Sequence, residues 1–234
     1  MKRIGIISLL FLFLCSCSAI RNTAKQELSD GFYNKKENSE KSRVYVHIAD
    51  ENIYTYKTIE KKTIEIDTTQ AYSVYFSELN TLGKNNFKLS QNSFDLDFFT
   101  IPLKLRFTQK DVPTQLNANI NGAVYIGYRI DRYKINYRGT PMKKAVRHVD
   151  HFGYSVGFFT GLGNTFMSPT NTHNVLQQEY DGIVWSKGIA GIVAINSFSV
   201  GITLGFDNLL DRNKKIWIYE NKPWLGLAFG LNLN

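Results

Sequence analysis

The sequence predicts an all-β protein, an antiparallel up-and-down β-barrel of about eight strands. Three observations carry this prediction. Large apolar residues alternate with Gly, Ala and Asn over residues 224–234, and five earlier segments share this period of two. No segment after the N-terminus reaches the roughly 18 apolar residues of a transmembrane helix. Since successive side chains of a strand point to opposite faces, each of these strands has one apolar face.

The five earlier segments are residues 94–107, 118–130, 153–163, 183–195 and 198–207. In the first, the apolar set changes phase at Phe98 and Phe99, which predicts a β-bulge there. In residues 198–207, large apolar residues alternate with small or polar residues, the last of which is Asp207. A soluble barrel normally carries charge on its water-facing side, and the terminal strand carries none. The pattern therefore favours lipid outside and a cramped interior.

Eight strands are the usual minimum for a barrel in a membrane, and six are readable here. Two more strands are expected from residues 43–76, or else from oligomerisation of the chain. Residues 43–90 form a small β-rich segment that is more charged than the following strands, so we expect it in the periplasm or at the barrel mouth. Residues 91–234 form the barrel itself.

The N-terminus predicts export. Lys2 and Arg3 precede an apolar run that ends at Leu14, too short to span a bilayer but typical of a secretory signal. Leu14-Cys15-Ser16-Cys17 then resembles the lipobox of bacterial lipoproteins. That resemblance implies a signal peptide of residues 1–16, and Cys17 as the mature N-terminus, carrying diacylglycerol on its thiol and an acyl chain such as palmitate on its amine. Ordinary cleavage after Ala19 is the alternative.

The composition of the chain agrees with the predicted export. Cys15 and Cys17 are the only cysteines, so the mature chain has no thiols for a disulfide, thiol catalysis or a cysteine-ligated zinc. Residues 17–42 are polar and charged and read as a flexible tether. The net charge of +8 falls to +6 when Lys2 and Arg3 are removed.

Connection lengths predict the sidedness. The links at 138–144 and 196–197 are short, whereas those at 164–182 and 208–223 are long. Outer-membrane barrels have short periplasmic turns and long external loops. Both ends of the barrel, and the lipid anchor on Cys17, are therefore expected on the periplasmic side of the outer membrane.

Two segments resemble small Gram-negative outer-membrane β-barrel families. Residues 95–107 (DLDFFTIPLKLRF) resemble their strand built around an Ile-Pro dipeptide, and the ending GLAFGLNLN is similar to their last strand. The chain ends in Asn234 after Leu233, whereas such barrels commonly end in an aromatic residue. The resemblance implies a barrel in the outer membrane.

Residues 147–151 form the one cluster of catalytic residue types in the sequence. A membrane-embedded lipid hydrolase or acyltransferase would use a histidine there with Ser155 or Ser168. Alternation, however, puts His148 and Asp150 on one face and His151 on the other, which separates the two histidines. We therefore expect no enzyme, and no motif indicates a metal site or a cofactor.

A basic stretch surrounds this cluster. Its cations are interleaved with tyrosines, a composition typical of the membrane interface, and we expect contacts with anionic lipid phosphates through Arg138, Lys143, Lys144 and Arg147. Nucleic acid is excluded as a partner by export. The leading hypothesis is a non-enzymatic outer-membrane lipoprotein with a structural, binding or small-solute role. The other alternative is a soluble lipocalin-like lipoprotein that binds an apolar ligand, with its apolar faces turned inward.

Overall fold

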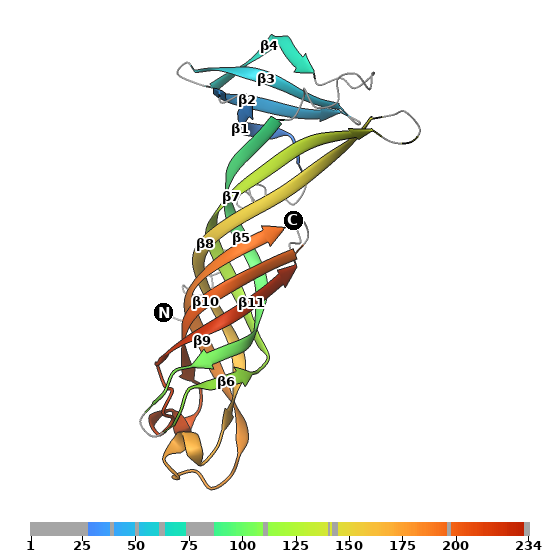
Figure 1. The fold of residues 1–234 in the computed structure, drawn as a ribbon. Helices are drawn as coiled ribbons and strands as arrows, with labels where there is room; N and C mark the ends of the chain where they lie inside the picture. The colour runs from blue at the N-terminus through green and yellow to red at the C-terminus, as the bar shows by residue number, and fades with distance from the viewer. Residues whose placement is uncertain are drawn as a thin grey trace, which may run out of the picture. The chain divides into compact units, whose positions relative to one another are not determined.

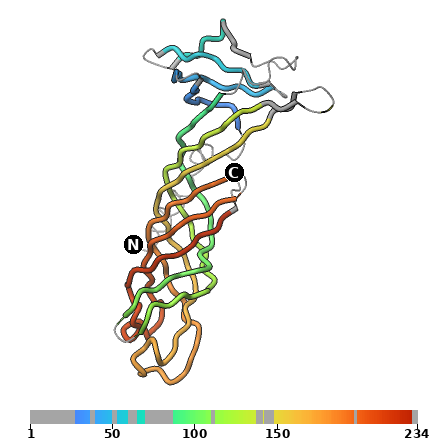
Figure 2. Tube along the Cα trace, in the orientation of Figure 1, coloured from blue at the N-terminus to red at the C-terminus, as the bar shows by residue number. Residues whose placement is uncertain are grey.

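The computed structural model describes residues 28–37, 40–49, 52–60, 64–73, 87–109, 112–139, 141, 145–195 and 198–231. Over these residues the chain is all-β, and its strands form one antiparallel sheet (Figure 1). Figure 2 traces the same backbone from blue at the N-terminus to red at the C-terminus. The predicted all-β, antiparallel fold class is therefore confirmed.

Six strands form a ring. They are β5 (Phe87–Arg106), β7 (Asn121–Gly139), β8 (Ala145–Met167), β9 (Tyr180–Ile195), β10 (Phe198–Leu209) and β11 (Pro223–Leu231). Each pairs with the next in this order, and β11 pairs back with β5. Along β10, Gly201 lies opposite Ala228 of β11 and opposite Ile192 of β9. The short strand β6 (Gln115–Ala118) pairs with β5 beside the ring.

Each of the six segments predicted from the alternation overlaps one strand of this ring, and residues 232–234 lie outside the described residues. The described strands of residues 43–76 do not join it, so the ring has six strands rather than about eight. Instead β1 (Gly31–Glu37), β2 (Glu40–Ala49), β3 (Asn52–Glu60) and β4 (Ile64–Ser73) continue the sheet outward from β5.

Part of the predicted tether, residues 17–42, is β-strand. β1 and the start of β2 occupy its second half, because Tyr33 is buried and packs with Val44 and Val46 of β2. Residues 17–27, and with them Cys17 and the whole signal segment, lie outside the described residues.

The chain divides into two compact units. Ser93–Arg129 and Tyr154–Asn234 belong to the first, here called the ring unit. Lys25–Asn92 and Ile130–Gly153 belong to the second, here called the sheet unit. Strands β5, β7 and β8 contribute residues to both.

The sheet unit has an ordinary apolar core. Its buried members come from β1, β2, β3, β5 and β7: Tyr33, Val44, Val46, Ile53, Phe87, Leu89, Tyr133 and Ile135. The outward positions between them are charged, for example Lys88, Arg132 and Lys134. This unit therefore has the polarity of a protein in water.

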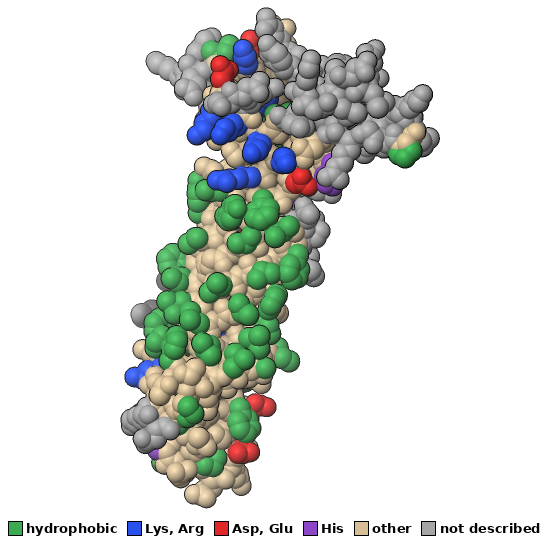
Figure 3. Space-filling model, in the orientation of Figure 1, with side chains coloured by type: hydrophobic (Ala, Val, Ile, Leu, Met, Phe, Trp, Pro, Cys, Tyr) green, Lys and Arg blue, Asp and Glu red, His purple; other side chains and the backbone are tan. Residues whose placement is uncertain are grey.

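The ring unit has the opposite polarity. Its large apolar side chains point outward: Ile202 is 65% exposed, Phe158 72% and Val156 70%. Figure 3 shows hydrophobic side chains gathered over one face of the ring strands. The intervening positions, such as Ser199, Thr203 and Asp207, are buried inside. Among the described residues, no helix is long and apolar enough to cross a membrane.

Candidate functional site

A charged cluster fills one stretch of the ring interior, and its position depends on a β-bulge. Leu103 of β5 lies opposite Leu227 of β11, whereas Thr100 lies opposite Phe229, so β5 holds one extra residue between these pairs. Pro102 lies in this interval; proline donates no backbone hydrogen bond and is tolerated at bulges. Before the bulge Phe99 and Ile101 are buried, and after it Lys104 and Arg106 are buried.

The prediction of a bulge at Phe98 and Phe99 is wrong, because the bulge lies between Thr100 and Leu103. The two phenylalanines keep the regular alternation, with Phe98 exposed and Phe99 buried. Phe99 points inward because its ring packs against Phe159 and Tyr125, at centroid distances of 5.8 and 5.7 Å. The change of face comes at Ile101 to Leu103 instead.

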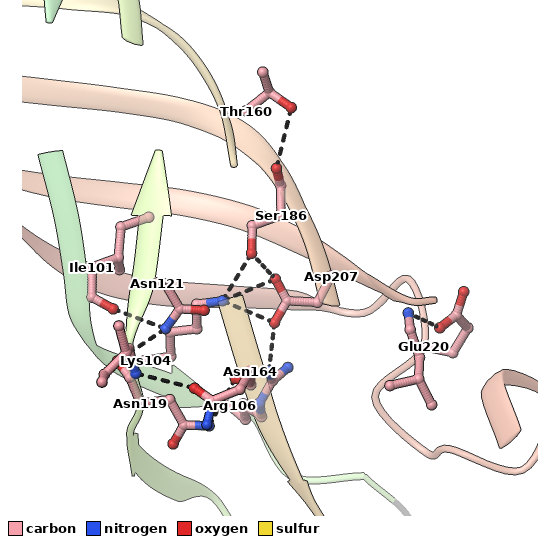
Figure 4. A network of polar contacts seen from close by, with 12 residues as sticks. Ile101, Lys104, Arg106, Asn119, Asn121, Thr160, Asn164, Ser186, Asp207 and Glu220 are labelled. Carbon is pink, nitrogen blue, oxygen red and sulfur yellow. Dashed lines mark hydrogen bonds and ion pairs between the residues drawn. The ribbon is translucent and has the colours of Figure 1, made fainter. Parts of the chain in front are cut away.

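Asp207 of β10 is the centre of the cluster (Figure 4). Lys104 Nζ donates to both of its carboxylate oxygens, at 3.0 and 3.1 Å, and Arg106 Nη2 donates to Oδ2. Ser186 Oγ of β9 donates to Oδ1 at 2.6 Å and accepts from Lys104 Nζ at 2.9 Å. The side chain of Asp207 is fully buried, and those of Lys104 and Arg106 are 2% exposed. Three strands of the ring are thereby joined through one carboxylate.

Aromatic rings lie against the two cations. Lys104 Nζ lies 4.4 Å from the ring centroid of Trp224, and Arg106 Cζ lies 5.0 and 5.3 Å from those of Trp217 and Tyr219. Such contacts are favourable when desolvated. They help to stabilise the second positive charge, because the single carboxylate of Asp207 balances only one of the two cations. Burial raises the pKa of Tyr219, and the positive charge of Arg106 opposes that rise.

Trp224 lies in the ring interior. It is fully buried and packs on Phe159 at 5.9 Å between centroids. Gly205 and Gly226 make the space: a Cβ at Gly205 would lie 2.4 Å from Trp224 Cζ2, and one at Gly226 would lie 2.9 Å from Cζ3. The small residues of the alternation thus make room for large interior side chains.

A second ion pair lies in the same unit. Arg129 Nη1 of β7 lies 3.8 Å from Asp95 Oδ1 of β5, and both side chains are almost fully buried. Between it and the Asp207 cluster lies an apolar layer: Phe99, Ile101, Ala123, Tyr125, Phe159, Ala190, Ile192, Trp224 and Ala228. The ring interior is therefore packed with side chains.

The histidines of the sequence-predicted cluster lie on opposite faces, as alternation indicated. His148 Nε2 lies 3.1 Å from Asp150 Oδ1, and both side chains are about half exposed. His151 is buried, lies 2.7 Å from Asp131 Oδ1 through Nε2, and stacks on Tyr133 at 4.7 Å between centroids.

The two serines considered as nucleophiles have other contacts. The hydroxyls of Ser155 and Tyr125 lie 2.7 Å apart and share a hydrogen bond. Ser168 donates its backbone N–H to Asn171 and accepts from Thr172 at its carbonyl. The described contacts thus join His151 to the carboxylate of Asp131 and Ser155 to the phenol of Tyr125.

The remaining predicted residues are not placed. Cys17, Lys143 and Lys144 lie outside the described residues, and the side chains of Arg138 and Arg147 are not described. Conversely, sequence reasoning missed Lys104, Arg106 and Ser186 as partners of Asp207. A signal existed: Lys104 and Arg106 alternate with Leu103, Leu105 and Phe107, so an outward apolar face puts both cations inside.

Comparison of the chain with known protein families, with curated proteins and with solved structures finds no match. Within the described ranges, no group of three or more His, Cys, Asp or Glu side chains is arranged to hold a metal ion. The polarity of the ring and the packing of its interior are therefore the features that bear on function.

Proposed function

We propose that this protein is a non-enzymatic outer-membrane β-barrel lipoprotein with a structural or binding role, whose acylated Cys17 lies on the periplasmic side. The observation that carries the proposal is the outward apolar face of the ring. On β10 alone, Phe198, Val200, Ile202, Leu204 and Phe206 are each at least 37% exposed.

The size of this face favours lipid over water as its surroundings. Exposed apolar area costs about 25 cal/mol per Å² in water, and soluble monomers rarely expose contiguous apolar patches larger than a few hundred Å². On the ring, outward apolar residues recur on every strand. A soluble lipocalin-like barrel requires the reverse arrangement, with its apolar faces inside and around a ligand.

The packed interior favours a structural or binding role over the passage of small solutes. Trp224, Arg106, Arg129 and Tyr125 are among the largest fully buried side chains, and all of them belong to the ring unit. A solute that crossed the ring would have to displace the Lys104–Asp207 ion pair. We therefore assign the interior to stability rather than to transport.

The proposed partners are the lipids of the outer membrane. At the periplasmic end, Arg138, Lys143, Lys144 and Arg147 are proposed to be attracted to anionic lipid phosphates from the water side, because clustered cations are attracted to such surfaces. The basic residues follow an apolar strand segment in the sequence, which is the order expected at an interface.

Radiolabelled palmitate tests the anchor. We expect label in the intact protein and in the control variant Cys15→Ala, and none in Cys17→Ala. Label in Cys17→Ala equal to that in the parent would overturn the anchor. After a carbonate wash, Cys17→Ala should remain in the membrane pellet and require detergent for release, because the ring itself is embedded. Its release by carbonate alone would contradict the membrane ring.

A further inference from the structure

The loop between β10 and β11 carries an exposed group of cations. Arg212, Lys214 and Lys215 belong to the 3-10 helix η3 (Arg212–Lys215), and Lys222 precedes β11; all four are exposed. None of them contributes to the interior cluster around Asp207. With Lys187 of β9 they are called here the loop-rim cations.

The two acids of the same loop are turned to internal contacts. Asp211 accepts from the Tyr180 hydroxyl and from the Asn213 backbone N–H, each at 2.7 Å. Glu220 accepts from the Leu209 backbone N–H and from Asn208 Nδ2, each at 2.9 Å. The loop therefore presents its positive charges outward while its carboxylates stabilise its fold.

The loop is held in a fixed arrangement. Ile218 donates its backbone N–H to the Asn171 carbonyl at 3.1 Å, and Asn221 donates to the Asp207 carbonyl at 2.9 Å. Trp217 and Tyr219 are buried in an apolar cluster with Met167, Val184 and Leu209. Because the backbone is anchored on both sides, the loop backbone needs little further ordering when a partner binds.

These cations border the apolar face of the ring. Lys187 of β9 lies opposite Phe206 of β10, which lies opposite Pro223 of β11. At about 4.8 Å between neighbouring strands, Lys187 and Pro223 are about 10 Å apart, and Lys222 adjoins Pro223. Outward Phe206 lies between them, so positive charge and apolar surface meet in one row.

The outward side chains in this row have the form of a membrane interface. Lys187 Nζ lies 4.5 Å from the ring centroid of Trp185, two residues nearer the start of β9. Trp185 is 41% exposed and donates from Nε1 to Thr160 Oγ1 at 2.8 Å. A lysine that extends over a tryptophan toward the strand end is typical of the boundary between hydrocarbon and headgroups. Two exposed acids, Glu179 and Asp181, limit the cationic surface at the start of β9.

We propose that the loop-rim cations bind the phosphates of anionic membrane lipids whose acyl chains lie on the ring, at the end of the ring where β10 leads into β11. The inference rests on the proposed function, since the acyl chains need the outward apolar face. Each cation near an anionic surface contributes about a fivefold gain in binding, and salt screens it.

Quenching of Trp185 by brominated lipids tests the proposal, because Trp217 and Trp224 are buried. The intact protein, reconstituted in phosphatidylcholine vesicles, is titrated with brominated phosphatidylglycerol or brominated phosphatidylcholine. The test variant replaces Arg212, Lys214, Lys215 and Lys222 by Gln. The matched control replaces Lys57, Lys88, Arg132 and Lys134 of the sheet unit by Gln, an equal change of charge.

We expect the parent and the control to prefer the anionic lipid by about tenfold or more, and the test variant to lose most of that preference. Equal quenching by the two lipids in the parent would overturn the loop-rim site alone. Equal loss in the test and control variants would also overturn it, since only net charge would matter. No quenching by either lipid would overturn the membrane ring together with the site.

Discussion

The ring unit and the sheet unit share three strands yet have opposite polarity. On β7, the outward residues Ile126 and Tyr128 of the ring unit are followed by the outward cations Arg132 and Lys134 of the sheet unit. On the inward face the change is reversed, from buried Arg129 to buried Ile135. The same strand geometry therefore occurs with apolar residues on the outward face in the ring unit and on the inward face in the sheet unit. The face that carries the apolar residues indicates whether the surroundings are apolar or aqueous.

The inversion falls at a row of buried charges. Arg129 and Asp131 are the last polar inward residues of β7 before Tyr133 and Ile135. The core of the sheet unit is apolar, whereas the interior of the ring unit holds buried ion pairs in addition to its apolar layer. Loss of one interior charge should accordingly have a larger effect in the ring than loss of a surface charge in the sheet unit.

The largest expected effect is from Asp207→Ala. Removal of this carboxylate leaves Lys104 and Arg106 buried without their counter-ion, and breaking such a pair costs about 3–5 kcal/mol. The matched change Asp150→Ala, in the half-exposed pair with His148, should cost about 0–1 kcal/mol. Urea unfolding in detergent, followed by tryptophan fluorescence, measures both. Equal losses in the two variants would contradict a stabilising role of the buried Asp207 ion pairs in the ring.

A smaller effect is expected from a charge on the outward face. Ile202→Arg should destabilise membrane assembly by about 2–4 kcal/mol, because residue 202 lies mid-strand on the proposed lipid face. Leu210→Arg, just past the end of β10, should cost about 0–1 kcal/mol, because the side chain reaches the interface. The fraction of each variant that resists carbonate extraction is the measurement. If both variants assemble as well as the parent, the outward face does not contact lipid.

The sequence predicted the six ring strands because their outward positions are large and apolar over long runs. It underestimated β7 and β8: β7 continues from residue 131 to Gly139, and β8 begins at Ala145 rather than at residue 153. The period of two persists there, but the apolar face inverts, so a single continuous apolar set does not exist. The alternation of apolar residues therefore did not indicate the full length of β7 and β8.

The charged cluster was predicted only in part. Asp207 was placed on the polar face of its strand, which is correct, but its partners on β5 lie 103 and 101 residues away in the chain. They meet only because β5 pairs with β11 and β11 with β10. The bulge was misplaced because Phe98-Phe99 resembles a slip, whereas packing of Phe99 inside the ring determines its direction.

The central claim is that the inversion of polarity along β7 marks the boundary between lipid and water. Single cysteines at outward positions 124, 126, 128, 130, 132 and 134 carry nitroxide labels in reconstituted bilayers, and relaxation by oxygen is compared with that by a water-soluble nickel chelate. We predict that oxygen dominates through position 130 and that the chelate dominates from position 132. Equal access of the chelate at positions 126 and 134 would contradict the account.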